Sequence, residues 1–439
     1  MKVVEKLNML CGREINRDLL FMKMNYFFAW GAYAPVIPFC ATIGKQRGYS
    51  ALAMGITLTG LQIPSLVVRP LLGSVTDAYQ CRKLMFLIGE VLSALAVLGL
   101  IFLPGATVAE SIADEIVFNT LLYWVFFFLL FFLYLGCVMR SLMEDTICVS
   151  LLGDNVHNYG QQRVWGAIGY GIISIVSGVV VDWFSIGQAH DDFRPGFVIA
   201  FICVAFDVYV SAKIKVEQVK KTETFSGNMK TVLTDFRVIV FLIATISFGF
   251  FYTFVLYFVI WYLEDITNLH HPEYEPHIKT IQGLSQTIQC FLGEVPFYFV
   301  SSYIIKKVGH MNVFSLTFVA YAIRFALYSI IENPVVALSV EIFHGITFAL
   351  PYSAGVAYAA KLAPVAAEGT MQGLVGMTMK GIGIPMGNFV GGYIIKNLGI
   401  VDAFRIFSIG SLMVCIVVST MNLIVKRMYK TENNVVQTS

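Results

Sequence analysis

The sequence has few charged residues for its length. Only 13% of its 439 residues are Asp, Glu, Lys or Arg, and 57% are hydrophobic, whereas about a quarter of the residues in a soluble domain are charged. The net charge of +2 gives no indication of a nucleic-acid partner. A soluble core of this size does not need so much apolar surface, so the composition predicts a chain that lies in a lipid bilayer.

Several features of secreted proteins and of enzymes are also missing. The sequence has no Asn-x-Ser/Thr sequon, and most of its eight Cys lie in apolar stretches rather than in a disulfide framework. No Walker-type loop occurs, so ATP is not expected, and no Ser/His/Asp or metal-ligand constellation points to catalysis. We therefore expect no enzyme activity, no cofactor and no metal site.

Twelve stretches are apolar and long enough to cross a bilayer, which takes roughly 20 residues. The N-terminal residues before them are broken by charges and lack the apolar core of a signal peptide, so the first stretch is expected to direct insertion. The fourth stretch is over-long and is expected to extend out of the membrane. The twelve stretches are 19–42, 50–72, 84–104, 117–150, 164–184, 196–214, 237–262, 279–304, 312–331, 335–360, 367–396 and 401–425.

Positive charge gathers on one side of these stretches. Because Lys and Arg of short loops stay in the cytoplasm, this side and both termini are expected to be cytoplasmic, in a multi-pass protein of the plasma membrane. The other side holds the stretch HHPEYEPH (270–277), which we interpret as an ordinary exterior loop rather than a metal site. The cations of the first side are Lys2, Lys6, Arg13, Arg17, Arg82, Lys83, Lys213, Lys215, Lys220, Lys221, Lys230, Lys306, Lys307, Lys361, Lys426, Arg427 and Lys430.

The longest cytoplasmic connection divides the chain into two halves. The segment KVEQVKKTETFSGNMK, between the sixth and seventh stretches, is polar and rich in Lys, as a linker between two halves should be. We therefore predict an N-terminal six-helix bundle over residues 1–214, a linker over 215–236, a C-terminal six-helix bundle over 237–425 and a cytoplasmic tail over 426–439.

The loop between the second and third stretches carries a recognisable motif. In GSVTDAYQCRK, the residues Gly73, Asp77, Arg82 and Lys83 have the spacing G-x-x-x-D-x-x-x-x-R-K. Gly lets two helices approach closely, Asp can cap a helix or pair with a cation, and the two cations hold the loop inside. The motif resembles the signature loop of the major facilitator superfamily. That resemblance implies an all-α membrane protein with twelve transmembrane helices, in two pseudo-symmetric six-helix bundles around a midplane cavity.

Seven charged or titratable residues lie deep in the predicted helices. A Lys at the centre of a membrane helix costs about 2.5–3.5 kcal/mol on insertion scales, so the least costly arrangement directs such groups into one wet cavity, paired with each other. Simpler roles stay open: Arg163 can anchor a helix end, Asp145 can brace a helix, and His344 can be a packing residue. The seven are Asp145, Arg163, Glu294, Arg324, Glu341, His344 and Lys380.

The spacing of these residues resembles that of the oligosaccharide/proton symporters of the lactose permease type, with the nucleoside/proton symporters nearby. In that permease an acid on helix four and an Arg on helix five hold the sugar, 18 residues apart, as Asp145 and Arg163 are here (163 − 145 = 18). An aromatic residue seven positions later stacks on the sugar, where Tyr170 stands here. In the second half, Arg324, His344 and Lys380 repeat the permease separations of 20 and 36.

The resemblance has gaps in the second half. The proton-carrying Glu of the permease corresponds to Thr347 here, and the segment FFYTFVLYF (250–258) lacks the acid that pairs with the permease Lys. Across nearly its full length, the chain is most similar to the family of major facilitator superfamily domain-containing protein 6. The stretches INRDLLFMKMNYFF, YGQQRVWGAIGYG, EVPFYFVSSYIIKKVGHMNV and EGTMQGLVGM carry this resemblance.

Together these features predict a secondary active transporter for a small polar organic solute, sugar- or nucleoside-like, that works by alternating access. Asp145 and Arg163 would bind the solute and Tyr170 would stack on it. Lys380 would pair with Glu294 or Glu341, or face an anionic solute group. The remaining charge network would be Glu294, Arg324, Glu341 and His344.

The rival interpretation is a receptor or accessory protein that keeps the fold without moving a solute. Discriminating the two is simple in principle, because a non-transporting protein should tolerate neutral residues at the cavity charges. The sequence leaves open the solute, the coupling ion, with protons as one candidate, and the oligomeric state, with a monomer as the simplest case.

The charge bias gives a direct prediction of topology. A cysteine introduced at position 225 should react with a membrane-impermeant thiol reagent only after the membrane is opened, and one at position 274 should react in intact cells. Labelling of position 225 from outside intact cells would contradict the orientation.

Overall fold

The computed structural model describes residues 17–79, 81–105, 112–152, 159–215, 234–363 and 368–438, and the regular structure within them is helical, with no strand. Most of the expected linker, residues 216–233, lies outside the described residues. The helices of the first half are α2 (Arg17–Tyr33), α3 (Cys40–Gln46), α4 (Ala51–Tyr79), α5 (Arg82–Phe102), α6 (Asp114–Asn119), α7 (Leu121–Leu152), α8 (Tyr159–Ser185) and α9 (Arg194–Lys213).

The second half follows the same plan with more interruptions. Several of its membrane helices change locally from α-helical to wider or narrower turns, which are labelled η. The elements are α11 (Phe236–Thr253), η2 (Phe254–Phe258), α12 (Val259–His270), η3 (Pro272–His277), α13 (Ile278–Ile288), η4 (Gln289–Glu294), α14 (Val295–Val308), α15 (His310–Tyr328), α16 (Pro334–Ala337), η5 (Leu338–Phe343), η6 (Gly345–Ala349), α17 (Leu350–Leu362), α18 (Glu368–Gly376), η7 (Met377–Gly383), α19 (Ile384–Leu398) and α20 (Ile400–Thr438).

Ten helical segments of the described chain are long and apolar enough to cross a membrane. The expected first and eleventh stretches are not among the ten. The first is divided into α2 and α3 by turns over residues 34–39, where Pro35 and Pro38 each remove a backbone donor. The eleventh, α18–η7–α19, is continuous in the described residues, but its glycines, Lys380 and Asn388 make it less apolar.

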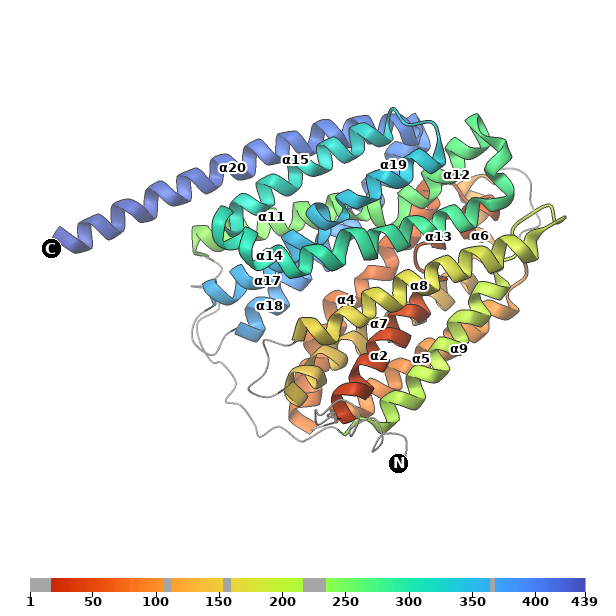
Figure 1. Cartoon of the computed structure of the whole chain (residues 1–439), viewed down its shortest axis with the longest axis horizontal. Coiled ribbons are helices and arrows are strands. Elements are labelled where there is room, and N and C mark those ends of the chain that lie inside the picture. The colour runs from red at the N-terminus through yellow and green to blue at the C-terminus, as the bar shows by residue number, and fades with distance from the viewer. Residues whose placement is uncertain are drawn as a thin grey trace, which may run out of the picture.

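The two halves repeat one packing scheme (Figure 1). In the first half α2 packs against α8 and α9, and α5 packs against α7 and α9. In the second half α11 packs against α19 and α20, and α15 packs against α17 and α20. The pairs correspond one to one in chain order, which is the internal pseudo-symmetry expected from the sequence. The last helix, α20, runs on through Thr438 instead of ending near residue 425.

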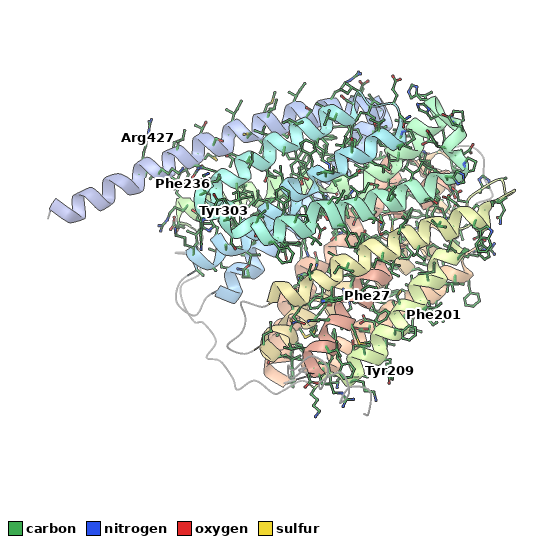
Figure 2. The ribbon with its side chains drawn as sticks, in the orientation of Figure 1. Phe27, Phe201, Tyr209, Phe236, Tyr303 and Arg427 are labelled. Carbon is green, nitrogen blue, oxygen red and sulfur yellow. The ribbon has the colours of Figure 1, made fainter. Side chains whose placement is uncertain are left out.

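The outer surface of the bundle is apolar. Large hydrophobic side chains stand on it in the middle of the helices, with exposed fractions of 73% for Phe299 and 67% for Ile416. Tyr209 on α9 and Tyr303 on α14 also lie on this surface (Figure 2). A soluble protein rarely exposes so much contiguous apolar surface, so lipid is its natural partner.

The halves meet along two helix pairs, α4 with α19 and α8 with α13. Close backbone approach makes both contacts possible. A Cβ on Gly55 would lie 2.5 Å from the Asn388 carbonyl oxygen, and a Cβ on Gly178 would lie still closer to the Lys279 carbonyl oxygen. Glycine is therefore required at both places, because any side chain would push the halves apart.

A cluster of ion pairs joins the halves at one end of the molecule, which we call the closed end. Lys279 of α13 is fully buried, and its Nζ lies 2.5 Å from Glu264 Oε2 and 3.1 Å from Asp191 Oδ2. Lys45 of α3 lies 3.1 Å from Glu264 Oε1 and 2.5 Å from Asp265 Oδ1. Further hydrogen bonds join the halves near the middle of the bundle, from the Gln62 amide to the Tyr257 hydroxyl (3.3 Å) and from the Thr287 hydroxyl to the Gly171 carbonyl oxygen (2.7 Å).

One carboxylate of the first half caps a helix of the second. Asp182 of α8 accepts hydrogen bonds from the backbone N–H groups of Lys279 (3.0 Å) and Thr280 (2.6 Å) at the start of α13. The Thr280 hydroxyl donates to it as well, at 2.6 Å. A carboxylate at a helix N-terminus satisfies free donors and complements the helix dipole. The contact therefore holds the two halves together through main-chain groups.

A more exposed pair completes the closed end. Lys396 of α19 lies 2.5 Å from Asp114 of α6. Partial burial works against ionisation of Asp114, but hydrogen bonds from Lys396 and from Ser50 outweigh it and hold the pKa of this carboxyl below its usual range. The pair therefore stays ionised at neutral pH and is lost only as the pH falls through that lowered pKa.

The closed end predicts a difference between buried and exposed pairs. Replacing Lys279 with Gln should lower the free energy of unfolding by about 3 kcal/mol, because a buried carboxylate loses a partner. Lys396→Gln, a control on the same end, should cost under about 1 kcal/mol. Thermal unfolding of the purified variants measures both.

The same substitution should loosen the closed end. A cysteine at Ser174, buried between α8 and α13, should react with an impermeant thiol reagent faster in the Lys279→Gln background than in the wild type. Equal labelling and equal melting temperatures would show that Lys279 does not hold this end shut.

Candidate functional site

The first half brings Asp145 and Arg163 to one aromatic group. Asp145, on α7, accepts a hydrogen bond of 3.0 Å from the Tyr26 hydroxyl of α2. The Arg163 guanidinium, on α8, lies 5.7 Å from the centre of the Tyr26 ring and 4.1 Å from that of Trp30. Such cation–π contacts orient a guanidinium without neutralising it. The acid and the cation thus share one wall, and both are partly exposed.

Tyr170 and Lys380 lie where the two halves meet. Tyr170, two turns after Arg163 on α8, lies within electrostatic range of Glu294 and Cys290 of the second half. Lys380, in η7, interacts with Asp145, Arg163 and Arg69 of the first half. Residues of both halves therefore influence one central region, as a solute site between two bundles requires.

Lys380 does not make the ion pair that we expected with Glu294 or Glu341. Within the described residues Glu341 pairs with Arg324 and Glu294 contacts His344, so both acids are engaged on their own half. Helix spacing alone placed Lys380 on a polar face but did not fix which bundle that face meets. Asp145 is an acid of the first half that lies within electrostatic range of Lys380.

The expected charge network of the second half is contiguous. Arg324 and Glu341 are completely buried, with Nη2 and Oε2 2.5 Å apart. The Tyr328 hydroxyl donates to Glu341 Oε1 at 2.9 Å, and Gln289 Nε2 donates to Glu341 Oε2 at 2.7 Å. Arg324 also donates to the Thr347 hydroxyl at 2.8 Å. The pair is therefore satisfied by hydrogen bonds, which a buried ion pair needs in order to be stable.

His344 links this pair to Glu294. Arg324 Nη1 lies 3.4 Å from His344 Nδ1, and His344 Nε2 lies 3.3 Å from Glu294 Oε1. Because a guanidinium can only donate, Nδ1 is the acceptor and the ring proton of the neutral imidazole stands on Nε2, toward the carboxylate. The order Glu294–His344–Arg324–Glu341 is a chain of polar contacts through the bundle.

Three polar residues of the second half lie in or next to wide π-helical turns. Glu294 ends η4, His344 directly precedes η6, and Lys380 lies in η7. After each turn, the backbone N–H of the next residue donates to the carbonyl oxygen five residues earlier. A proline directly follows that donor residue. A proline cannot donate to the helix and crowds the preceding turn, so widening accommodates it. Such turns are frequent at functional sites. The three prolines, Pro296, Pro351 and Pro385, are the sequence signal of this arrangement.

The loop motif is only partly described. Helix α4 runs through Gly73 and Asp77, whose side chains lie outside the described residues. Lys83 donates to the carbonyl oxygens of Ala212 (2.9 Å) and Ile214 (2.7 Å), at the C-terminal end of α9. A cation there complements the helix dipole. Arg82 begins α5 beside it.

Sequence reasoning missed several residues of the central region. Arg69 of α4 lies within electrostatic range of Lys380 and of Tyr352 of α17. Tyr352 also interacts with Asp145 and Arg163. An arginine one residue before Pro70 could have been noticed as a charge within a long apolar stretch. Tyr352 carried no signal, because tyrosines are common in apolar helices.

The buried pair of the second half leads to a prediction on stability. Arg324→Gln and Glu341→Gln should each lower the free energy of unfolding by about 3–5 kcal/mol, because each leaves an uncompensated buried charge. The double variant should recover at least about 1 kcal/mol of the summed loss. A double-mutant cycle of thermal unfolding measures this, with Arg405→Gln at the exposed pair with Asp402 as the control. Additive losses would contradict a direct pair.

Comparison with known proteins identifies relatives over most of the chain. A family model described as the MFS_1 like family matches residues 19–406. Among curated proteins, the chain is 22% identical over 416 residues to the uncharacterized transporter YwbF of Bacillus subtilis (strain 168), an alignment that covers 91% of this chain and 92% of that protein.

Solved transporters share the fold. The nucleoside transporter NupG superposes with a TM-score of 0.71 at 17% identity, over 92% of this chain and 99% of that one. A mutant of the same transporter gives a TM-score of 0.74 at 18% identity. The xylose transporter XylE of E. coli, in an inward-open conformation, gives a TM-score of 0.66 at 11% identity, over 92% and 95%. These likenesses establish the major facilitator fold of the chain and leave the solute to be argued from its own residues.

Proposed function

We propose that this chain, which belongs to the MFS_1 like family of major facilitator transporters, moves a small polar organic solute between its two bundles. The solute would be sugar- or nucleoside-like. The family makes the chain a multi-pass secondary transporter and not an enzyme. The finer proposal concerns the class of solute and the residues that bind it.

The observation that carries the proposal is the mixed composition of the central region. Asp145 can accept hydrogen bonds from solute hydroxyls, while Arg163 and Lys380 can donate to oxygens or to an anionic group. Their mutual interaction across the halves means that one solute can contact both bundles. Tyr170 offers an aromatic face for a sugar ring or a base.

The cations of this region refine the choice of solute. Lys380 is repelled by Arg69 and Arg163, and Asp145 offsets part of this repulsion. A solute that carries an acceptor-rich or anionic group would relieve the repulsion among them, because opposite charge is stabilised where like charges meet. Nucleosides and hexoses, which are rich in oxygen acceptors, and small organic acids, which are anionic, are therefore the first candidates to test.

The closed end supports an alternating-access cycle. The ion pairs and the cap at α13 hold one side shut, and we propose that this side is the exterior and that both termini are cytoplasmic, in the plasma membrane. The proposed bundles, 1–214 and 237–425, would then rock about the contacts α4–α19 and α8–α13. Opening the exterior requires the Lys279 cluster to separate.

A solute panel tests the proposal directly. Purified protein is heated with nucleosides, sugars and small carboxylates. A true solute binds the folded state only, so it should raise the free energy of unfolding by about 2.7 kcal/mol at a hundredfold excess over its dissociation constant. The melting temperature should rise accordingly. Uptake of the same compound into proteoliposomes then separates transport from mere binding.

The binding residues give the matching prediction. Asp145→Asn and Arg163→Ala should weaken binding of that compound roughly ten- to hundredfold, because each removes a charge-assisted contact of about 1.5–3 kcal/mol. Asp402→Asn, on the exposed surface of α20, should leave binding unchanged. Wild-type transport by both site variants would place the solute elsewhere, and a receptor role would gain support if neutral residues at all the central charges were tolerated.

A further inference from the structure

A cluster of buried acids lies in the first half, away from the solute site. Glu90 of α5, Asp207 of α9 and Glu144 of α7 have exposed fractions of only 1%, 2% and 1%. Arg140 of α7 pairs with Glu144, with Nη1 and Oε2 2.7 Å apart. If Glu144 and Arg140 neutralise each other, the charges of Glu90 and Asp207 remain to be compensated by other means.

Two polar side chains hold Glu90 and Asp207 together. Asn25 Nδ2 of α2 donates to Asp207 Oδ1 at 2.6 Å and lies 3.5 Å from Glu90 Oε1. It also donates to Ser211 Oγ at 2.9 Å, and the Ser211 hydroxyl donates to Glu90 Oε1 at 3.0 Å. Glu90 Oε2 is buried, and among the described residues no N–H or O–H group donates to it. Two carboxylate oxygens of the cluster, Glu90 Oε2 and Glu144 Oε1, therefore lack a donor among the described residues.

The two carboxyl groups lie close together, because Asp207 Oδ1 and Glu90 Oε1 lie 2.6 Å and 3.5 Å from the same Asn25 Nδ2. Ionised carboxylates are acceptors only, so a hydrogen bond between two of them requires one proton on the pair. Two carboxyl groups this close cannot both ionise without strong repulsion, and such pairs are known to share one proton.

We propose that Glu90 and Asp207 form a proton-binding site in the N-terminal bundle that couples proton movement to transport. The inference rests on the proposed function, because coupling has meaning only if a solute is moved. The Glu90–Asp207 pair differs from the charge network of the second half, where Arg324 compensates the charge of Glu341.

The chemistry of the step is simple. The pair holds one proton and takes a second from a hydronium ion, so one O–H bond of hydronium breaks as one O–H bond forms on the remaining carboxylate, and the charge of the cluster rises by one. Release is the reverse. No other bond forms or breaks, and no other reactant is needed.

A sodium ion fits the site less well than a proton. Asn25 directs its amide N–H groups toward the acids, and a donor at that position would repel a metal cation. The Glu90 oxygen that lacks a donor would need several further oxygen ligands to coordinate sodium. The observations therefore favour the proton, and sodium becomes an outcome of the test.

The site has a short physical connection to the solute residues. Asn25 is followed on α2 by Tyr26, which donates to Asp145, and Glu144 directly precedes Asp145 on α7. Trp30 of α2 lies between Arg140, whose guanidinium is 5.6 Å from its ring, and Arg163, at 4.1 Å. A change in charge at the pair therefore acts on α2 and α7, which both carry solute-site residues.

Other titratable groups surround the pair and belong in any account of its pH dependence. They come from each helix packed against it. They are Arg140, Glu144 and Cys137 from α7, Tyr33 from α2 and Cys203 from α9, with Asp145 and Arg163 acting on Glu144 from the solute site.

The first experiment needs no solute. Infrared difference spectra of the purified full-length protein are recorded between acidic and alkaline pH, in water and in heavy water, to detect the carbonyl stretch of protonated carboxylic acids. The wild type should show such a band that disappears as the pH rises. Glu90→Gln and Asp207→Asn should each lose it, and Asp402→Asn should keep it.

A milder variant keeps the test decisive if those two proteins do not fold. Ser211→Ala removes one hydrogen bond to Glu90 and should shift the pH midpoint of the band without abolishing it. A band that survives in both acid variants, an unmoved midpoint in Ser211→Ala, or a response to sodium chloride but not to pH would overturn the proposal.

The second experiment uses the compound found by the solute panel. In proteoliposomes, the wild type should accumulate it when a proton gradient is imposed, and Glu90→Gln should lose this accumulation while exchanging labelled for unlabelled compound across the membrane. If exchange and accumulation fall together, the pair has a structural role and the coupling proposal is wrong. If the wild type exchanges no compound of the panel, the proposed function fails, whereas the infrared result still decides whether the pair binds a proton.

Discussion

The low dielectric of the bilayer governs how this protein arranges its deepest charges. A buried charge without a partner is too costly to keep, and the most deeply buried cations accordingly each have an acid. Arg324 has Glu341, Arg140 has Glu144, and Lys279 has Glu264. The first pair lies in the second half and the second pair in the first half, while Lys279 also lies 3.1 Å from Asp191 across the junction. One rule therefore supports each bundle and also their junction.

The junction shares close glycine contacts with the bundles that it joins but adds ions that close one end. Gly55 and Gly178 allow backbones of the two halves to meet, as Gly249 and Gly383 do inside the second half, and the Lys279 cluster closes the end. Contacts of this kind release as a unit, because a small separation removes many of them together. The stable bundles and the separable interface are what a rocking mechanism requires.

Much of this architecture can be read from the sequence. Twelve apolar stretches and a Lys-rich connection predict the helix order, and matched separations indicate that Asp145 and Arg163 face the same region. The surroundings of Lys380 could not be predicted because residue spacing does not fix helix rotation, and π-helical turns alter it further. Glu90 went unnoticed although an acid two turns beyond Arg82 lies too deep to reach water easily. Asp207 gains its meaning only from the residues beside it.

The carboxylate of Asp182 at the start of α13 has a consequence for the conditions under which the protein works. When the closed end separates, the helix terminus and Lys279 exchange their fixed acids for water and dissolved ions. Salt can then screen these exposed groups, whereas it has no access to them while they are buried. Higher ionic strength therefore stabilises only the separated arrangement, which makes the balance between the two conformations depend on the electrolyte bathing that face.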